Sequence, residues 1–526
     1  MTENGANVDD PLSGEELRAA AVRGIRWSSI GRPTTELIQL GSVVVLAHLI
    51  VPAEFGRYAV ALIAQEAGYV LISAGLSSAL IQRKNLNREH LQSGMALGLI
   101  GGFALTALML LVAVTIVSPV FGSRTALFVE LLAPLCLISG AGTVSTARLS
   151  RSMAFRRLSE IEVVGAFIRV AACVGLALYG LNGEALVLGT MIAAVATLAM
   201  AWLSMRPPLP RLHRRAAREL MDYGLPVSMA AIGWVGFSNV DYAIIGARLG
   251  PLSTGLYFRA YTLAVEYQNK ISVVMTQVGF PVLSRTKHPS ELTAMHRQMV
   301  RLLTILLFPL LVILAITAPV LVPFLFGHRW VGAVLPVQIL AVGGATRLVT
   351  DAVGTVLMAT GRTRALLGFG MAHFIAYGLA VFIVVPLGIA AVAVAAAVVH
   401  SLFLVFAYAL LLRDSQEHPL RRLWDDVAPA TVSCLGLVVV AVPVSLAVSS
   451  AHAPAVLQLA AVGLLAVPAY LLTLRVGFPD VWRSQSAIVE RVMPGLRRRG
   501  RPDAPEVKPL PVESLPVDPP GVHSAA

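Results

Sequence analysis

Long apolar runs, separated by short polar connections, recur along the chain from about residue 25 to about residue 475. Each run has about 20 residues or more, the length that an α-helix needs to cross the hydrocarbon core of a bilayer. The pattern therefore predicts an all-α polytopic membrane protein. Fourteen spans are expected, near residues 25–50, 56–82, 91–118, 125–147, 159–180, 183–204, 223–249, 255–283, 299–326, 330–358, 364–387, 389–412, 428–449 and 453–475.

The composition agrees with this class and narrows the chemistry. Of 526 residues, 56% are apolar and 13% are charged, whereas a soluble chain carries about 25% charged residues. The polar, acidic start has no apolar core, so we expect no cleavable signal peptide. The three cysteines are isolated within apolar runs and suggest neither a disulfide framework nor a metal site. No G-x-x-x-x-G-K-[ST] phosphate loop occurs, so we expect neither ATP hydrolysis nor a cofactor.

The net charge of +12 is distributed as a topology signal. Alternate connections and the two termini hold 32 of the 41 Lys and Arg residues, and the opposite connections hold five. The positive-inside rule then predicts a multi-pass protein with both termini in the cytoplasm and an even number of spans. Because the basic excess is explained in this way, no nucleic-acid partner is expected.

The chain also repeats itself with an offset of about 200 residues, or six spans. "LAHLIVPAEFGRYAVA" follows the first span and "GARLGPLSTGLYFRAY" follows the seventh, so that Gly56 aligns with Gly255 and Tyr58 with Tyr257. Two six-helix lobes are therefore expected, related by a pseudo-twofold axis along the membrane normal, with two extra C-terminal helices. The predicted parts are a cytoplasmic segment (1–22), an N-lobe (23–205), a basic linker (206–222), a C-lobe (223–412), the two extra spans (428–475) and a disordered basic, proline-rich tail (476–526).

Charged side chains inside the spans are costly and mark candidate sites. The pairs Arg32/Glu36, Glu266/Lys270 and Arg347/Asp351 stand four residues apart, which allows each pair to neutralise itself on one helix face. The alternative is functional, because polar residues form stripes on spans 1, 2, 7 and 8, the repeat-related pairs. On that interpretation the stripes line one central cavity, and Asp241 faces a hydrated cleft between the lobes. His373 and His400 are either buried, hydrogen-bonded residues or a proton relay.

Several segments resemble one known family. "SNVDYAIIGARLG" followed by "STGLYFRAY", "GLSSALIQRKNLNREH" and "FLFGHRWVGAVLPVQIL" resemble bacterial polysaccharide-unit flippases of the multidrug/oligosaccharidyl-lipid/polysaccharide (MOP) exporter superfamily, over about residues 20–412. The resemblance implies a transporter, not an enzyme. It implies that undecaprenyl-diphosphate-linked oligosaccharide moves from the inner to the outer leaflet of a bacterial plasma membrane by alternating access between two lobes arranged in a V.

The resemblance also assigns roles to particular residues. Cationic residues of the cavity would hold the diphosphate. Arg57 and Arg259 also stand at near-equivalent places in the two repeats. They either flank the cavity mouth and hold the diphosphate between them, or anchor the helix ends at the lipid headgroups. With the acids of the same stripes, the candidate substrate-binding residues are Arg32, Glu36, Arg57, Asp241, Arg248, Arg259, Glu266 and Lys270.

Two other functions stay open at this stage. A drug or metabolite antiporter of the same superfamily, driven by Na⁺ or H⁺, would use Glu36, Asp241 and Asp351 as coupling carboxylates. A membrane-embedded glycosyltransferase or polymerase would need acidic catalytic residues on a large outer loop, and the outer connections have only a few residues. The expected partners are a polyprenyl-diphosphate-linked glycan, membrane lipids, a driving force of Na⁺, H⁺ or membrane potential, and polysaccharide polymerase or glycosyltransferases.

Overall fold

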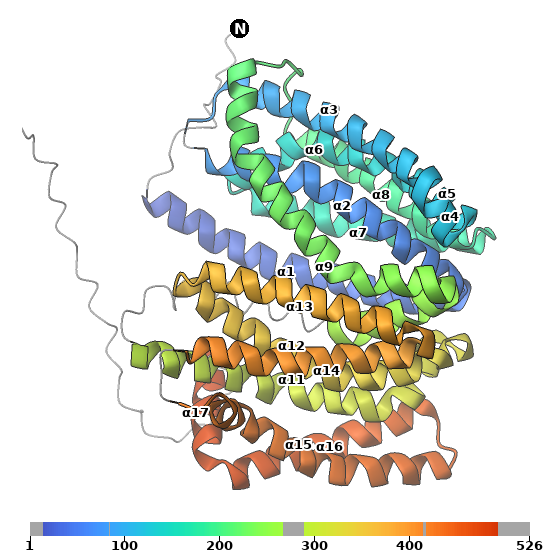
Figure 1. Ribbon diagram of the computed structural model, residues 1–526, viewed down its shortest axis with the longest axis vertical. Helices are drawn as coiled ribbons and strands as arrows, with labels where there is room; N and C mark the ends of the chain where they lie inside the picture. The colour runs from blue at the N-terminus through green and yellow to red at the C-terminus, as the bar shows by residue number, and fades with distance from the viewer. Residues whose placement is uncertain (1–13, 84, 267–288, 414–416, 493–526) are drawn as a thin grey trace, which may run out of the picture. The chain divides into compact units, whose positions relative to one another are not determined.

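The computed structural model describes residues 14–83, 85–266, 289–413 and 417–492, and this described part is helical with no β-strand. Figure 1 shows the arrangement. The helices, including two π-helical segments (η1, η2) and two 3₁₀ segments (η3, η4), are α1 (Gly14–Leu49), α2 (Pro52–Gln82), α3 (Arg88–Val112), η1 (Ala113–Val117), α4 (Ser118–Phe121), α5 (Ser123–Leu132), α6 (Pro134–Arg151), α7 (Phe155–Leu178), α8 (Gly183–Ser204), α9 (Arg214–Tyr261), η2 (Thr262–Glu266), α11 (Pro289–Phe326), η3 (His328–Ala333), α12 (Val334–Ala359), α13 (Thr363–Val384), η4 (Val385–Leu387), α14 (Ile389–Leu411), α15 (Pro419–Ser450), α16 (Ala455–Gly477) and α17 (Pro479–Val492).

The predicted spans coincide with these helices, and the all-α polytopic membrane fold is confirmed. Among the described residues, eleven helices are long and apolar enough to cross a bilayer. The helices α1 and α9, which hold the first and seventh predicted spans and the start of the eighth, are not among the eleven. They carry the charged residues of the polar stripes, which lower their mean hydropathy. The eighth span beyond Glu266 lies outside the described residues.

A break at Gly250 divides α9 into the two helices that the pattern predicts. Its φ of +78° lies in the left-handed region, which glycine adopts at no steric cost. The next residue, Pro251, has no backbone N–H to continue the helical hydrogen bonds. The first half of α9 begins at Arg214, within the predicted basic linker.

Residues 1–477 form one compact unit. Its N-lobe contains α1 to α8, in which α1 packs on α7 and α3 on α6, and its C-lobe contains α9 to α14, in which α12 packs on both α11 and α14. The helices α15 and α16 pack on each other and on α11. The two lobes meet chiefly where α2 and α9 lie side by side (Figure 1).

The connections between the helices of this unit lie at two opposite ends of the helix bundle. We call the end that carries connections 82–88, 204–214 and 411–419 the basic end. The end that carries connections 49–52 and 178–183 is the opposite end.

The repeat alignment is visible in a close, reciprocal backbone contact at the opposite end. A Cβ on Gly56 would lie 1.8 Å from the carbonyl oxygen of Pro251, and a Cβ on Gly255 would lie 1.9 Å from that of Pro52. Only glycine allows two helices to cross so closely. Because the two contacts exchange equivalent residues of the repeats, the pseudo-twofold axis passes between Gly56 and Gly255.

Residues 478–526 form a second unit, which is described by itself. The prediction of disorder from residue 476 is wrong for 479–492, which form α17. Pro479 occupies the first turn with Asp480 beside it, and the apolar residues that follow recur at helical spacing, which favours an amphipathic helix. Residues 493–526, with their arginine cluster and proline-rich run, lie outside the described residues.

Candidate functional site

An aromatic and cationic junction joins the lobes at the opposite end. The Arg259 guanidinium of α9 lies 4.1 Å from the ring centroid of Phe55 on α2 and 5.9 Å from that of Trp330 in η3. The Phe55 and Trp330 rings meet edge to face at 5.4 Å. The indole Nε1 of Trp330 donates to the Ala47 carbonyl oxygen of α1 at 3.0 Å. These contacts close the two lobes against each other at this end, and we call Phe55, Arg259 and Trp330 the aromatic junction.

Arg57 lies beside the aromatic junction but is bound within the N-lobe. Its Nη1 lies 2.5 Å from Oε1 of Glu54, a carboxylate that Arg124 also contacts at 3.3 Å. Arg124 reaches Glu184 of α8 at 3.0 Å. Both members of the predicted pair lie at the opposite end: Arg259 packs over the Phe55 ring, and Arg57 follows Phe55 by two residues on α2. In this conformation the two arginines flank a packed junction rather than an open mouth, because Arg259 is only 6% exposed.

Asp241 does not face a cleft between the lobes, so that prediction is wrong for this conformation. Its side chain is 2% exposed and lies inside the C-lobe. The Tyr377 hydroxyl of α13 donates to Oδ2 at 2.8 Å, and the backbone N–H of Tyr242 donates to Oδ1 at 2.9 Å. The carboxylate is held by its own lobe because α13 packs over this height of α9.

Several other ionisable side chains are buried near Asp241 in the C-lobe. Arg347 of α12 donates to the Tyr261 hydroxyl of α9 at 2.5 Å, and its positive charge acts on both Asp241 and Asp351. The rings of His373 and His400 meet edge to face with centroids 4.9 Å apart. His400 Nδ1 lies 2.5 Å from the Ala396 carbonyl oxygen, as expected of a buried, hydrogen-bonded histidine. The C-lobe thus encloses a continuous set of ionisable side chains from α9 to α14.

The remaining predicted residues are scattered. Arg248 is exposed, with its guanidinium 4.8 Å from the Phe382 ring centroid. Glu36 on α1 and Glu266 at the end of η2 are half-buried. Arg32 lies on α1 but its side chain is outside the described residues, as is all of Lys270.

The polar stripes consequently do not line one cavity. The stripe on the seventh span consists of Trp234, Ser238, Asp241 and Arg248. Asp241 points into the C-lobe, while Trp234 on the same predicted face of α9 is exposed. Tyr58 on α2 turns into the N-lobe, where its hydroxyl lies 2.8 Å from Oγ1 of Thr190 on α8. Helical periodicity defines a face, but the neighbour that covers that face changes with height along the helix.

A second polar contact joins α2 and α3 to the start of α9 at the basic end. The Glu219 carboxylate accepts from Arg83, the residue that follows α2, lies 3.0 Å from His90 Nε2 of α3, and accepts from Arg215 at 3.2 Å. The hydrogen bond from His90, more than those of the arginines, holds the Glu219 pKa below its ordinary value of 4.5. We call Arg83, His90 and Glu219 the basic-end latch.

Sequence reasoning missed several of these residues. Tyr377 holds Asp241, and Glu219 holds Arg83, through contacts between distant parts of the chain. Glu54 holds Arg57 three residues along the same helix and Arg124 from another helix. Several missed residues do stand in segments that carry the repeat or the family resemblance: Glu54 and Phe55 in "LAHLIVPAEFGRYAVA", His90 in "GLSSALIQRKNLNREH" and Trp330 in "FLFGHRWVGAVLPVQIL". Nothing in a single sequence pairs Tyr377 with Asp241, because 136 residues separate them.

Comparison with known proteins places the chain among envelope-polysaccharide proteins. The family described as "Polysaccharide biosynthesis protein" matches residues 45–335. Teichuronic acid biosynthesis protein TuaB of Bacillus subtilis is 24% identical over 373 residues, covering 69% of this chain and 76% of TuaB. Lipopolysaccharide biosynthesis protein WzxC of Escherichia coli is 25% identical over 352 residues, covering 66% of this chain and 71% of WzxC.

Solved structures share the fold. The inward closed conformation of lipid II flippase MurJ superposes with a TM-score of 0.70 at 13% identity, covering 86% of this chain and 99% of MurJ. An inward-facing multidrug resistance MATE family transporter of the MOP superfamily superposes with a TM-score of 0.57 at 12% identity, covering 73% of this chain and 96% of the transporter. These likenesses show that the chain has the fold of this superfamily.

Proposed function

Because the chain belongs to the polysaccharide biosynthesis protein family, we propose that it translocates a lipid-linked oligosaccharide from the inner to the outer leaflet of the bacterial plasma membrane. The substrate is an undecaprenyl-diphosphate-linked repeat unit of a surface polysaccharide. The protein is a transporter and not an enzyme, and its two lobes expose the substrate path alternately to the two sides. Its basic end faces the cytoplasm, as do both termini.

The aromatic junction is the observation that carries this proposal. Each of its contacts is weak, because a cation–π contact contributes about 0.5–2 kcal/mol and an aromatic pair about 0.5–1.5 kcal/mol. The contacts can therefore be broken one at a time. A set of such contacts holds two lobes closed and still allows them to part when a ligand favours the open state. Parting would expose the buried Arg259 guanidinium at the outer side, where a diphosphate can replace the aromatic ring as its partner.

Arginine suits this exchange because its planar fork grips two phosphate oxygens at once. In the closed state Phe55 covers the Arg259 guanidinium, and in the open state the diphosphate of the arriving substrate does so. Arg57 would join it when Glu54 releases it. The other cationic candidates, Arg32, Arg248 and Lys270, stay proposals that rest on family resemblance.

The membrane potential favours outward movement. Moving one charge through 100 mV contributes about 2.3 kcal/mol, so a diphosphate of charge about −2 gains roughly 4–5 kcal/mol on leaving a negative interior. Should a cation be coupled to transport, the buried carboxylate of Asp241, with Tyr377 beside it, is the group on which Na⁺ or H⁺ would act. Membrane lipids and the polymerase or glycosyltransferases of the same polysaccharide are the proposed partners.

The proposal is tested by surface-glycan output in cells depleted of the native protein, normalised to the amount of protein in the membrane. Arg259→Ala should lower output at least tenfold, and Arg259→Lys should restore it only in part, because lysine lacks the bidentate fork. Arg364→Ala, which removes an exposed arginine at the start of α13, is the matched control and should leave output unchanged. Full output from Arg259→Ala would remove this residue from the mechanism, and full output from cells lacking the protein would remove the function.

A further inference from the structure

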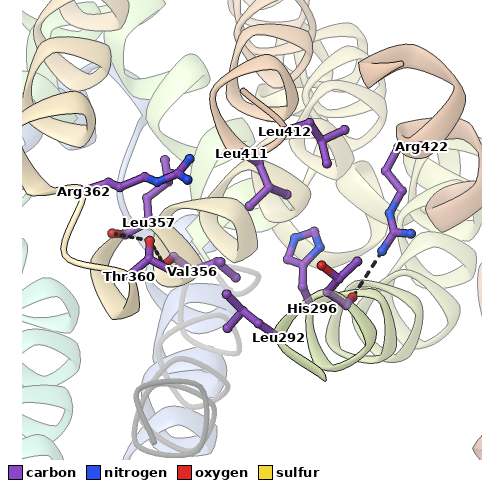
Figure 2. A pocket seen from close by; sticks show the side chains of 10 residues that line it. Leu292, His296, Val356, Leu357, Thr360, Arg362, Leu411, Leu412 and Arg422 are labelled. Carbon is purple, nitrogen blue, oxygen red and sulfur yellow. Dashed lines mark hydrogen bonds between the residues drawn. The ribbon is translucent and has the colours of Figure 1, made fainter. Parts of the chain in front are cut away.

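A cavity of about 180 Å³ lies in the C-lobe at the basic end, away from both the aromatic junction and the Asp241 group. It is enclosed by the start of α11, the connection between α12 and α13, the end of α14 and the start of α15. Figure 2 shows its aliphatic walls, formed by Leu292, Val356, Leu357, Leu411 and Leu412. Polar side chains occupy the same lining: Thr293, His296, Thr360, Arg362 and Arg422.

His296 is the unusual member of this lining. Its side chain is 1% exposed, and within the part of the chain that the structure describes its Nε2 has no hydrogen-bond partner. In Figure 2 its imidazole ring lies between Leu292 and Leu411. A buried polar atom without a partner is costly, so such an atom in a cavity wall indicates a ligand that supplies the missing bond.

Positive charge surrounds the same cavity. Arg362 and Arg422 line it from opposite sides, as Figure 2 shows. Arg422 is fixed by its own contacts, donating to the Thr293 carbonyl oxygen at 3.1 Å and lying 3.3 Å from the fully buried Asp426. Asp426 is shared with a second arginine, Arg297, at 3.1 Å, and Glu417 lies 3.7 Å from Arg422. Two carboxylates thus balance Arg297 and Arg422, and Arg362 adds a further positive charge to the lining. The field in the cavity therefore favours an anion.

The size of the cavity restricts what that anion can be. A water molecule takes up about 30 Å³ in the liquid, so 180 Å³ corresponds to roughly six waters. This volume suits a phosphoryl group with a few attached carbon atoms better than a whole oligosaccharide. The aliphatic walls suit the start of an acyl chain or a glycerol backbone, while Arg362 and a neutral His296 carrying its proton on Nε2 suit phosphoryl oxygens.

We propose that this cavity binds the phosphoryl headgroup of an anionic phospholipid, between Arg362 and His296, with the adjoining carbons against Leu292, Val356 and Leu411. Basic pockets between helices on the cytoplasmic side of a membrane are known to bind lipid headgroups. The site is separate from the transport path, and its binding does not depend on the transported substrate. It would tie the connections after α12 and α14 to the inner leaflet.

The test measures binding by thermal melting of the full chain, purified in detergent and stripped of lipid. The three probes are dihexanoyl phosphatidic acid, inorganic phosphate, and dihexanoyl glycerol, which has the same chains without the phosphate. The variants are Arg362→Gln and His296→Phe, the second of which keeps a ring in place but removes Nε2. Arg364→Gln, two residues from Arg362 and outside the cavity lining, is the matched control. The melting temperature without ligand reports whether each variant folds.

Phosphatidic acid should raise the melting temperature of the wild type and of Arg364→Gln, with an apparent Kd at least tenfold weaker in Arg362→Gln and in His296→Phe. Protection by phosphatidic acid alone assigns the phosphoryl group to a lipid. Equal protection by inorganic phosphate, with the same dependence on Arg362, assigns it to free phosphate. Protection by dihexanoyl glycerol equal to that by phosphatidic acid overturns the proposal, as does a loss of affinity below threefold in every variant that folds.

Discussion

Replacing Gly56 by alanine tests whether the crossing of the two repeats at the opposite end sets the balance between closed and open lobes. The added Cβ would lie 1.8 Å from the Pro251 carbonyl oxygen, whereas ordinary contact begins at about 3.4 Å. The helices must therefore part by roughly 1.6 Å at this crossing. Inserting a methyl group into a well-packed interface costs about 1–3 kcal/mol. Because the open state does not contain the contact, the substitution should favour opening by about 5- to 150-fold.

The assay is the rate at which a membrane-impermeant maleimide, added outside cells, labels an engineered cysteine at the junction. Ala260 is 0% exposed and packs in the apolar core that both lobes share at this end, so Ala260→Cys reports opening. The three native cysteines are replaced by alanine to remove background labelling. We expect the double variant Gly56→Ala/Ala260→Cys to be labelled at least fivefold faster than Ala260→Cys alone.

Two control variants separate opening from general unfolding. Gly101→Ala on α3 places its Cβ in open space and should leave labelling unchanged. Gly75→Ala, near the basic end, brings its Cβ to 2.1 Å from the Gly224 carbonyl oxygen and should not speed labelling from outside. An unchanged labelling rate in a folded Gly56→Ala protein would show that the glycine crossing does not hold the outer side closed.

Two further predictions concern the buried and surface carboxylates. Tyr377→Phe removes a hydrogen-bond donor from Asp241. Because a hydrogen bond to a charged group contributes about 1.5–3 kcal/mol, the melting temperature should fall. The fall should be smaller when the same substitution is made in an Asp241→Asn background, and equal falls would show that the two side chains act independently. Glu219→Gln should weaken the basic-end latch. Because the pKa of Glu219 is depressed in the folded state, the ionised carboxylate stabilises that state above pH 4.5, and this stabilisation is lost as the pH falls through the depressed pKa. The difference in melting temperature between wild type and Glu219→Gln should thus be constant from pH 6 to 8 and shrink below pH 4, and a difference that grows on acidification would contradict this assignment.

The span pattern, the helix break and the repeat could all be predicted from the sequence, because each depends on local rules. A bilayer of fixed thickness demands apolar runs of fixed length, and the observed helices cover those runs, although α1, α9, α11 and α15 begin well before them. Gly250 and Pro251 interrupt α9 through their own backbone chemistry. The alignment of Gly56 with Gly255 needed only the order of residues, and the structure adds that these two glycines touch.

The partners of the charged residues were decided only by the tertiary structure. The spacing of Trp234, Asp241 and Arg248 predicted one shared face, yet α13 covers Asp241 and leaves Trp234 exposed. Glu54 pairs with Arg57 at a spacing of three residues, which the sequence permits, but its second partner, Arg124, is brought to it only by helix packing. The energy of a charge in a membrane depends on which group lies within a few ångströms, and that group is supplied by whichever helix packs there, at a sequence distance that no local pattern records.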